Sequence, residues 1–219
     1  DAFILEGLMA ENLKPNLRAP SRHLIRRAYY DLTGLPPTFE AVEVFNAEND
    51  QRSAWDNLVN QLLASERYGE KLASLWLDTV RYAETNGFER DNKKPYIWRY
   101  RDYVIKAFND NKPYDRFVAE QLAGDELPDS DVAAKVATGF MTLMQRDDEP
   151  ADRDQAHSDM ISDIVDVSSE AFLGTTMGCA KCHDHKVDPI PQADYYSLMS
   201  FFDSINTSHL QQPNRAWYD

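Results

Sequence analysis

Residues 95–108 read Pro95-Tyr96-Ile97-Trp98-Arg99-Tyr100-Arg101-Asp102-Tyr103-Val104-Ile105-Lys106-Ala107-Phe108. Apolar side chains recur in this stretch three or four positions apart, as they do on one face of a helix. Ile97, Tyr100, Val104 and Phe108 follow this spacing, and Pro95 suits the first turn of a helix because it needs no amide donor there. The stretch therefore predicts an amphipathic helix that begins near Pro95.

The same spacing recurs along the chain on both sides of this stretch. We predict further helices over residues 21–32, 38–45, 51–65, 72–83, 117–124, 131–143, 155–173 and 195–202. No segment alternates convincingly between apolar and polar residues, and no convincing hairpin dipeptide is found. The sequence therefore predicts an all-α fold, an irregular multi-helix domain.

Local signals place the ends of several predicted helices. Ser21 and Thr38 are expected to cap helix N-termini, and Gly34 is expected to end the helix that precedes it. The run Tyr68-Gly69-Glu70 is expected to break the helical pattern. No linker rich in serine or glycine divides the chain, so we expect one domain over residues 1–219.

Composition excludes several classes of function. The 219 residues include 23 Lys and Arg against 37 Asp and Glu, which gives a formal net charge of −14. So acidic a surface repels phosphate backbones, which argues against nucleic acid as a partner and favours a basic protein. The mean hydropathy is −0.60, and no apolar run is long enough for a membrane span. A glycine-rich phosphate-binding loop is also missing from the sequence.

The two cysteines of the chain lie in one short motif, Cys179-Ala180-Lys181-Cys182-His183. This C-x-x-C-H form is the attachment signature of c-type haem. Two thiols that are separated by one short turn can add across the two vinyl groups of one porphyrin. The next residue, His183, then lies beneath the iron and can supply the proximal imidazole ligand. We therefore predict one covalent haem c near the C-terminal end of the domain.

Other interpretations of the motif stay open at this point. A C-x-x-C pair can be a thioredoxin-like redox site, although that site belongs in a βαβ unit that this sequence lacks. A zinc ion could use Cys179, Cys182 and His185, but a structural zinc site needs a fourth ligand. A chance match is the remaining alternative.

The sixth iron ligand is not decided by the motif. His185 cannot reach the opposite face of a haem that His183 holds, so it is expected to form hydrogen bonds near the haem edge. The remaining candidates are histidines and methionines elsewhere in the chain: His157, His23, His209, Met199, Met141, Met144, Met160 and Met177. For each of them, packing in the core or exposure on the surface is the alternative.

Two further groups of charged residues have a functional and a plain interpretation. Arg99 and Arg101 could pair with haem propionates, because a guanidinium group fits a carboxylate. Alternatively, they pair with the acidic residues of the protein itself. Asp163, Asp166 and Glu170 could bind calcium or form an interaction surface, but a solvated helix face is the simpler interpretation.

Longer blocks of the sequence match a known family. They are Leu24–Arg27 with Asp31–Thr38, Leu62–Ser65 with Tyr68–Glu70, Trp76–Asp78, Arg81–Ala83, Trp98–Ile105, Asn109–Asp115, Glu120–Asp125, Ala137–Phe140, Ala171–Thr176 and Cys179–Ile190. With these blocks in this order, the chain resembles the second cytochrome-like domain of the planctomycete-type cytochrome c surface proteins, long described as a domain of unknown function.

The resemblance implies an exported protein, periplasmic or at the cell surface, because haem is attached covalently outside the cytoplasm. It also implies flanking domains. The chain opens at Asp1 without an initiator methionine, so we expect it to be part of a longer polypeptide.

Together the motif and the resemblance predict a monohaem c-type cytochrome domain that serves electron transfer. Its partner would be a basic redox protein or other domains of the same polypeptide. One alternative is a haem enzyme, peroxidase-like or oxidative, with an open distal site. The other is a module of a surface assembly in which haem staples the fold.

Overall fold

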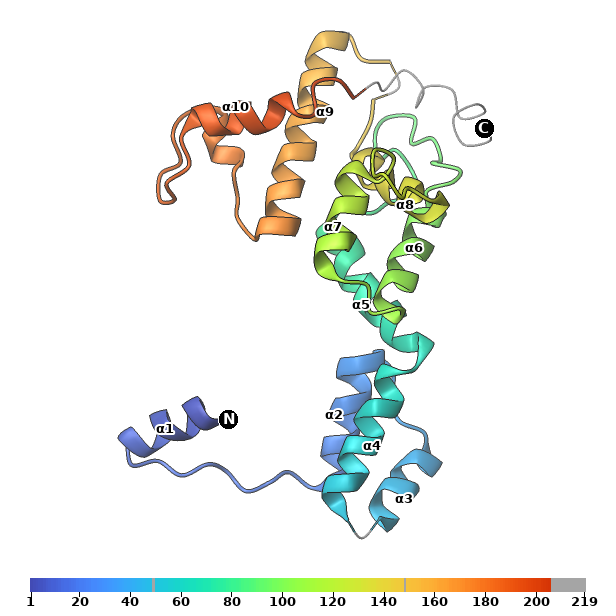
Figure 1. The fold of residues 1–219 in the computed structure, drawn as a ribbon, viewed down its shortest axis with the longest axis vertical. Helices are drawn as coiled ribbons and strands as arrows, with labels where there is room; N and C mark the ends of the chain where they lie inside the picture. Colours follow the sequence, from blue (N-terminus) through green and yellow to red (C-terminus); the bar gives the residue numbers. More distant parts are fainter. Residues whose placement is uncertain (49, 148, 206–219) are drawn as a thin grey trace. The chain divides into compact units, whose positions relative to one another are not determined.

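A computed structural model describes residues 1–48, 50–147 and 149–205 (Figure 1). In these ranges it contains ten α-helices and no strand, and its β-type pairing is a single isolated bridge between Thr85 and Lys93. The prediction of an all-α fold is confirmed. One candidate ligand, His209, lies outside the described residues.

The chain forms two compact units, Asp1–Tyr68 and Gly69–Asp219. The expectation of a single domain over residues 1–219 stays a prediction. The first unit contains the helices α1 (Ala2–Ala10), α2 (Ser21–Thr33), α3 (Phe39–Ala47) and α4 (Gln51–Leu63). Helices α2, α3 and α4 bury one apolar cluster, which includes Ile25, Phe45, Leu58 and Leu62.

Two of the three predicted helix ends in this unit are confirmed. Gly34 ends α2 in the left-handed conformation, with a φ of 71°, which costs glycine little because it has no Cβ. The Thr38 side chain accepts a hydrogen bond from the Ala41 amide and so caps α3. Ser21 is instead the first residue of α2, and the N-cap position belongs to Pro20.

Helix α5 (Glu66–Thr79) runs through Gly69, so the predicted break at 68–70 is wrong. The reason for a glycine here is a close approach between two helices. The Gly69 amide donates to the Asn109 side chain at 2.8 Å, and a Cβ at position 69 would lie 2.5 Å from the Ile105 carbonyl oxygen. The glycine therefore marks a contact with α6 rather than a helix end.

The second unit contains the remaining helices. They are α6 (Trp98–Asn109), α7 (Tyr114–Ala123), α8 (Val132–Ala137), α9 (Arg153–Ser168) and α10 (Gln192–Ser200), with single turns at Thr138–Thr142, Ser169–Leu173 and Gly178–Lys181. Helix α6 begins at Trp98, one turn after the proline that was expected to start it.

The apolar face of α6 lies in the first core of this unit. Tyr100, Tyr103 and Val104 are buried there together with Phe117 from α7, and the rings of Tyr103 and Phe117 are stacked with centroids 6.0 Å apart. The periodicity that predicted the helix therefore also identified its buried side.

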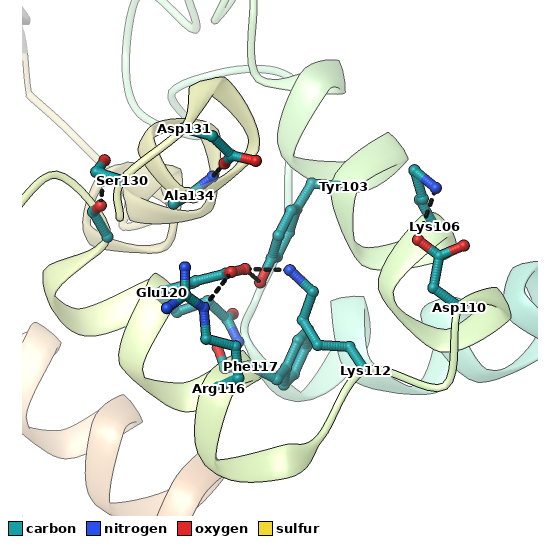
Figure 2. A network of polar contacts seen from close by, with 12 residues as sticks. Tyr103, Lys106, Asp110, Lys112, Arg116, Phe117, Glu120, Ser130, Asp131 and Ala134 are labelled. Atoms are coloured by element: carbon teal, nitrogen blue, oxygen red, sulfur yellow. Dashed lines mark hydrogen bonds and ion pairs between the residues drawn. The ribbon is translucent and has the colours of Figure 1, made fainter. Parts of the chain in front are cut away.

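Glu120 on α7 is the buried acid of this core, and its side chain is only 5% exposed (Figure 2). The Tyr103 hydroxyl and the Lys112 ammonium donate to Oε2, and Arg116 Nε donates to Oε1 at 2.7 Å. Burial by itself raises the pKa of Glu120, but these donors outweigh it and hold the pKa below its usual value. The carboxylate therefore stays charged inside the fold.

The second core lies between α9 and α10. It buries Ile164 and Val165 of α9 and Tyr195 of α10. Five methionines contribute to this core or pack against it: Met141, Met144, Met160, Met177 and Met199. Ala180, the residue after the first motif cysteine, is fully buried in the same cluster. This core therefore supports the motif.

Candidate functional site

The motif forms a tight turn on the surface of the second core. Residues Gly178–Lys181 make one 3-10 turn, and the Cys182 amide donates to the Cys179 carbonyl at 3.4 Å. Both cysteines are free and exposed. Because Ala180 between them is buried, the turn is anchored by its middle and presents a thiol at each end.

The imidazole of His183 is exposed and held in one orientation. Nδ1 lies 2.7 Å from the carbonyl oxygen of the neighbouring Asp184, and a nitrogen bonded to a carbonyl must carry the proton. Nε2 is then the nitrogen with the free lone pair. A hydrogen bond from Nδ1 to a carbonyl is the usual support of a metal-bound histidine, because it orients the ring and increases its basicity.

The donor set of the turn fits a c-type haem. Two free thiols and one imidazole lie within five consecutive residues, and all three are exposed. Covalent attachment needs accessible thiols, and axial ligation needs an unprotonated ring nitrogen. Cys179, Cys182 and His183 meet both requirements.

His185 makes different contacts from His183, and its expected place near a haem edge stays a prediction. Its Nδ1 accepts from the backbone amide of Asp188 at 2.9 Å, which puts the ring proton on Nε2. The His185 amide in turn donates to the Ile190 carbonyl at 2.9 Å, and only 9% of its side chain is exposed. His185 therefore shapes the loop after the motif.

Helix α10 holds the other side of this loop. The Asp184 carboxylate accepts from the Gln192 amide at 2.8 Å, at the first residue of α10. The Gln192 side chain and the Tyr196 hydroxyl both donate to the Lys181 carbonyl, at 3.1 and 3.0 Å. The C-terminal helix thus fixes the backbone on both sides of Cys182.

Asp166 on α9 packs against the turn and contacts α10. Its Oδ1 accepts from the Tyr195 hydroxyl at 3.2 Å, and a Cβ on Gly178 would lie 3.4 Å from its carboxylate. Burial raises the pKa of Asp166, and the carboxylates of Asp163 and Glu170 add to this, whereas Tyr195 and the Lys181 ammonium oppose it. The plain interpretation of this helix face as solvated is wrong for Asp166.

We expect Asp166→Asn to increase the free energy of unfolding slightly near neutral pH. The folded-state pKa of Asp166 is raised, so its contribution to stability is full at low pH and is lost as the pH rises through that pKa. Asparagine can still accept from Tyr195 but carries no charge. Urea denaturation at several pH values measures the effect. Asp159→Asn, at an exposed position of α9, is the control. A variant that is less stable than the wild type at neutral pH would contradict this account.

The other candidate ligands include the five methionines of the second core and two histidines. His157 is partly buried on α9, and Met199 packs against the second core. His23 is exposed on α2, in the first unit. Their part in binding iron stays a prediction.

Arg99 and Arg101 lie on α6 and use local partners. Arg101 pairs with Glu84 and Asp102, and the Arg99 guanidinium lies over the rings of Tyr96 and Trp98. For Arg101 this is the plain interpretation, in which the arginine pairs with acidic residues of the protein.

The described residues form neither a metal-binding group nor a membrane-spanning helix. Across 1–48, 50–147 and 149–205, no three His, Cys, Asp or Glu side chains gather where they could hold one metal ion. Cys179, Cys182 and His185 are therefore not arranged as the zinc alternative requires. In the same ranges, no helix is both long enough and apolar enough to cross a bilayer.

One group of basic residues was missed by the sequence reasoning. Arg81, Lys94 and Arg146 come from three separate segments; Arg81 binds Asp163 of α9, and Lys94 interacts electrostatically with both arginines and with Asp163. Each is unremarkable in the sequence, because no spacing rule connects positions so far apart.

A family model described as "PSCyt2: Protein of unknown function (DUF1549)" matches residues 1–207. Comparisons with curated proteins and with solved structures found no match.

Proposed function

The chain belongs to the PSCyt2 family of proteins of unknown function, and on that premise we propose that it is an exported monohaem c-type cytochrome domain. In this proposal it is the second cytochrome-like domain of a planctomycete-type surface protein. Its function is to transfer electrons, and its partner is a basic redox protein or another domain of the same polypeptide.

The observation that carries the proposal is the chemistry of the turn. Cys179 and Cys182 present free thiols at the two ends of a turn whose middle is buried. His183 follows with Nδ1 bonded to the Asp184 carbonyl, so Nε2 is the ring nitrogen that is available to a metal. These are the three protein groups that a c-type haem requires, in the order that it requires them.

Each of these residues has a defined task in the proposed function. Cys179 and Cys182 each form a thioether bond to the porphyrin, and His183 donates its Nε2 lone pair to the iron. The haem supplies reversible one-electron chemistry when it is bound. The Asp184 carbonyl and the contacts of α10 hold the imidazole and the turn in place.

The net charge of the chain affects the reduction potential of a bound haem and the choice of partner. A formal charge of −14 favours the oxidised, more positive state of a bound iron and therefore lowers the reduction potential. The same charge attracts a basic partner and makes the encounter rate fall as ionic strength rises.

The test is to export the chain in a host that attaches c-type haem and to measure the pyridine haemochrome spectrum and the intact mass. We expect one covalent haem per chain, and none in the double variant Cys179→Ala and Cys182→Ala. Carbon monoxide is then added to the reduced protein. An unchanged spectrum supports electron transfer through a six-coordinate iron, and a shifted spectrum supports the enzyme alternative. A wild-type chain that folds in this host without haem would refute the proposal.

A further inference from the structure

Three basic side chains and one acid interact electrostatically in the second unit of this acidic protein, with Lys94 as their common member. Arg81 binds Asp163 with both Nε, at 3.1 Å, and Nη2. Lys94 lies within electrostatic reach of Arg81, Arg146 and Asp163. The group therefore has three positive charges and one negative charge, although the chain as a whole has a formal charge of −14.

Arg81 adopts a backbone conformation that is unusual for its residue type. Its φ is 53°, whereas the other non-glycine residues with positive φ in the described ranges are Asn or Asp. The amides of Arg81 and Tyr82 bond to the carbonyls of Asp78 and Leu77, which is the Schellman arrangement that normally places glycine at this position. An arginine here costs about 1 kcal/mol of backbone strain relative to glycine. Such strain at a residue with a directed side chain points to a function.

Lys94 is half-buried, and the hydrogen bonds of its ammonium to the described residues go to carbonyl oxygens. Its ammonium donates to the carbonyl oxygens of Leu143 and Met144, at 3.1 and 2.8 Å. An ammonium has three donors, so these two bonds leave capacity for one more acceptor. Burial lowers the pKa of Lys94 to about 8, and the positive charges of Arg81 and Arg146 contribute to the shift. The positive charges around Lys94 therefore favour the binding of an anion.

The group lies close to the motif. Asp163, which holds Arg81, is one helical turn before Asp166 on α9, and Asp166 packs against Gly178, the residue before Cys179. Met144, whose carbonyl accepts from Lys94, belongs to the same buried cluster as Ala180 of the motif. The same core thus joins the basic group to the turn that carries the thiols.

We propose that Arg81, Lys94 and Arg146 bind the propionate carboxylates of the haem that is tethered at Cys179 and Cys182. This inference rests on the proposed function. It assigns to these three residues the pairing with haem propionates that the sequence suggested for Arg99 and Arg101. The propionates occupy the remaining donor of Lys94 and share the guanidinium groups with Asp163. The binding orients the porphyrin on the protein and keeps the propionates ionised.

The test compares Lys94→Gln with Lys93→Gln in the haem-loaded protein. Both variants remove one positive charge, and Lys93 is the exposed neighbour. We expect Lys94→Gln alone to lower the midpoint potential, because losing a cation near the haem favours the ferric state. We also expect the inflection in the plot of potential against pH to move to higher pH, because propionates without this partner release their protons less readily. Arg81→Gly is a second variant, in which the backbone is relaxed and the guanidinium is gone, and the same two shifts are expected.

The results separate this inference from the proposed function. The haemochrome spectrum of each variant first reports whether haem is attached. If haem is attached and Lys94→Gln and Arg81→Gly behave like Lys93→Gln, the propionate assignment is overturned while the cytochrome proposal stands. If the wild type carries no haem, both are overturned.

Discussion

Replacement of His183 by alanine is expected to leave haem attached through both thioethers but to remove one axial ligand from the iron. The Soret band of the oxidised protein should therefore shift, and the midpoint potential should change. Added imidazole should reverse the spectral shift, because a free imidazole can occupy the space that the side chain leaves. Absorption spectra with and without imidazole, recorded beside a haemochrome measurement, check this expectation.

The matched control is His185→Ala, two residues further along the same loop. His185 uses Nδ1 to accept from the Asp188 amide, so its loss should loosen the loop without removing an iron ligand. A spectrum that changes in His185→Ala and stays the same in His183→Ala would reverse the two assignments. A loss of covalent haem in both variants would instead show that the loop is needed for attachment.

Replacement of Glu120 by alanine is expected to lower the free energy of unfolding by about 3 kcal/mol, because it removes the carboxylate that pairs with the largely buried Lys112, whereas Arg116 keeps Asp129 as a partner. The side chains of Lys112 and Arg116 are only 20% and 32% exposed, so water cannot fully replace the carboxylate. The Tyr103 hydroxyl also loses its buried acceptor. Chemical denaturation, with the transition followed by circular dichroism, measures the loss.

The control for this variant is Asp110→Asn, which removes the exposed ion pair between Lys106 and Asp110 that Figure 2 also shows. An exposed pair contributes at most about 0.5 kcal/mol, so this variant should be nearly neutral. The effect of Glu120→Ala also depends on pH. The folded-state pKa of Glu120 is lowered, so its contribution is present above the unfolded-state pKa and is lost as the pH falls through the folded-state value. Equal losses in the two variants would contradict the role of burial.

The helices were predictable because their signals are local. The apolar spacing of residues 95–108 identified α6 and its buried side, and Gly34 and Thr38 end and begin helices as expected. The failures have tertiary causes. Gly69 reads as a break in sequence, but it lies inside α5, and a glycine is needed there because α6 passes too close for a Cβ. Helix α1 (Ala2–Ala10) was not predicted, and none of its residues is buried.

The sequence by itself determined the helical class and the chemistry of the turn. Helical periodicity acts over a few residues, and Cys179, Cys182 and His183 are so close together that their spacing alone sets the reach of their side chains. Only the tertiary structure decided which charges meet. Arg81, Lys94, Arg146 and Asp163 come from separate segments, and the tertiary fold brings the other three within electrostatic reach of Lys94. Contacts between distant segments depend on how the cores pack, and no local pattern encodes that packing.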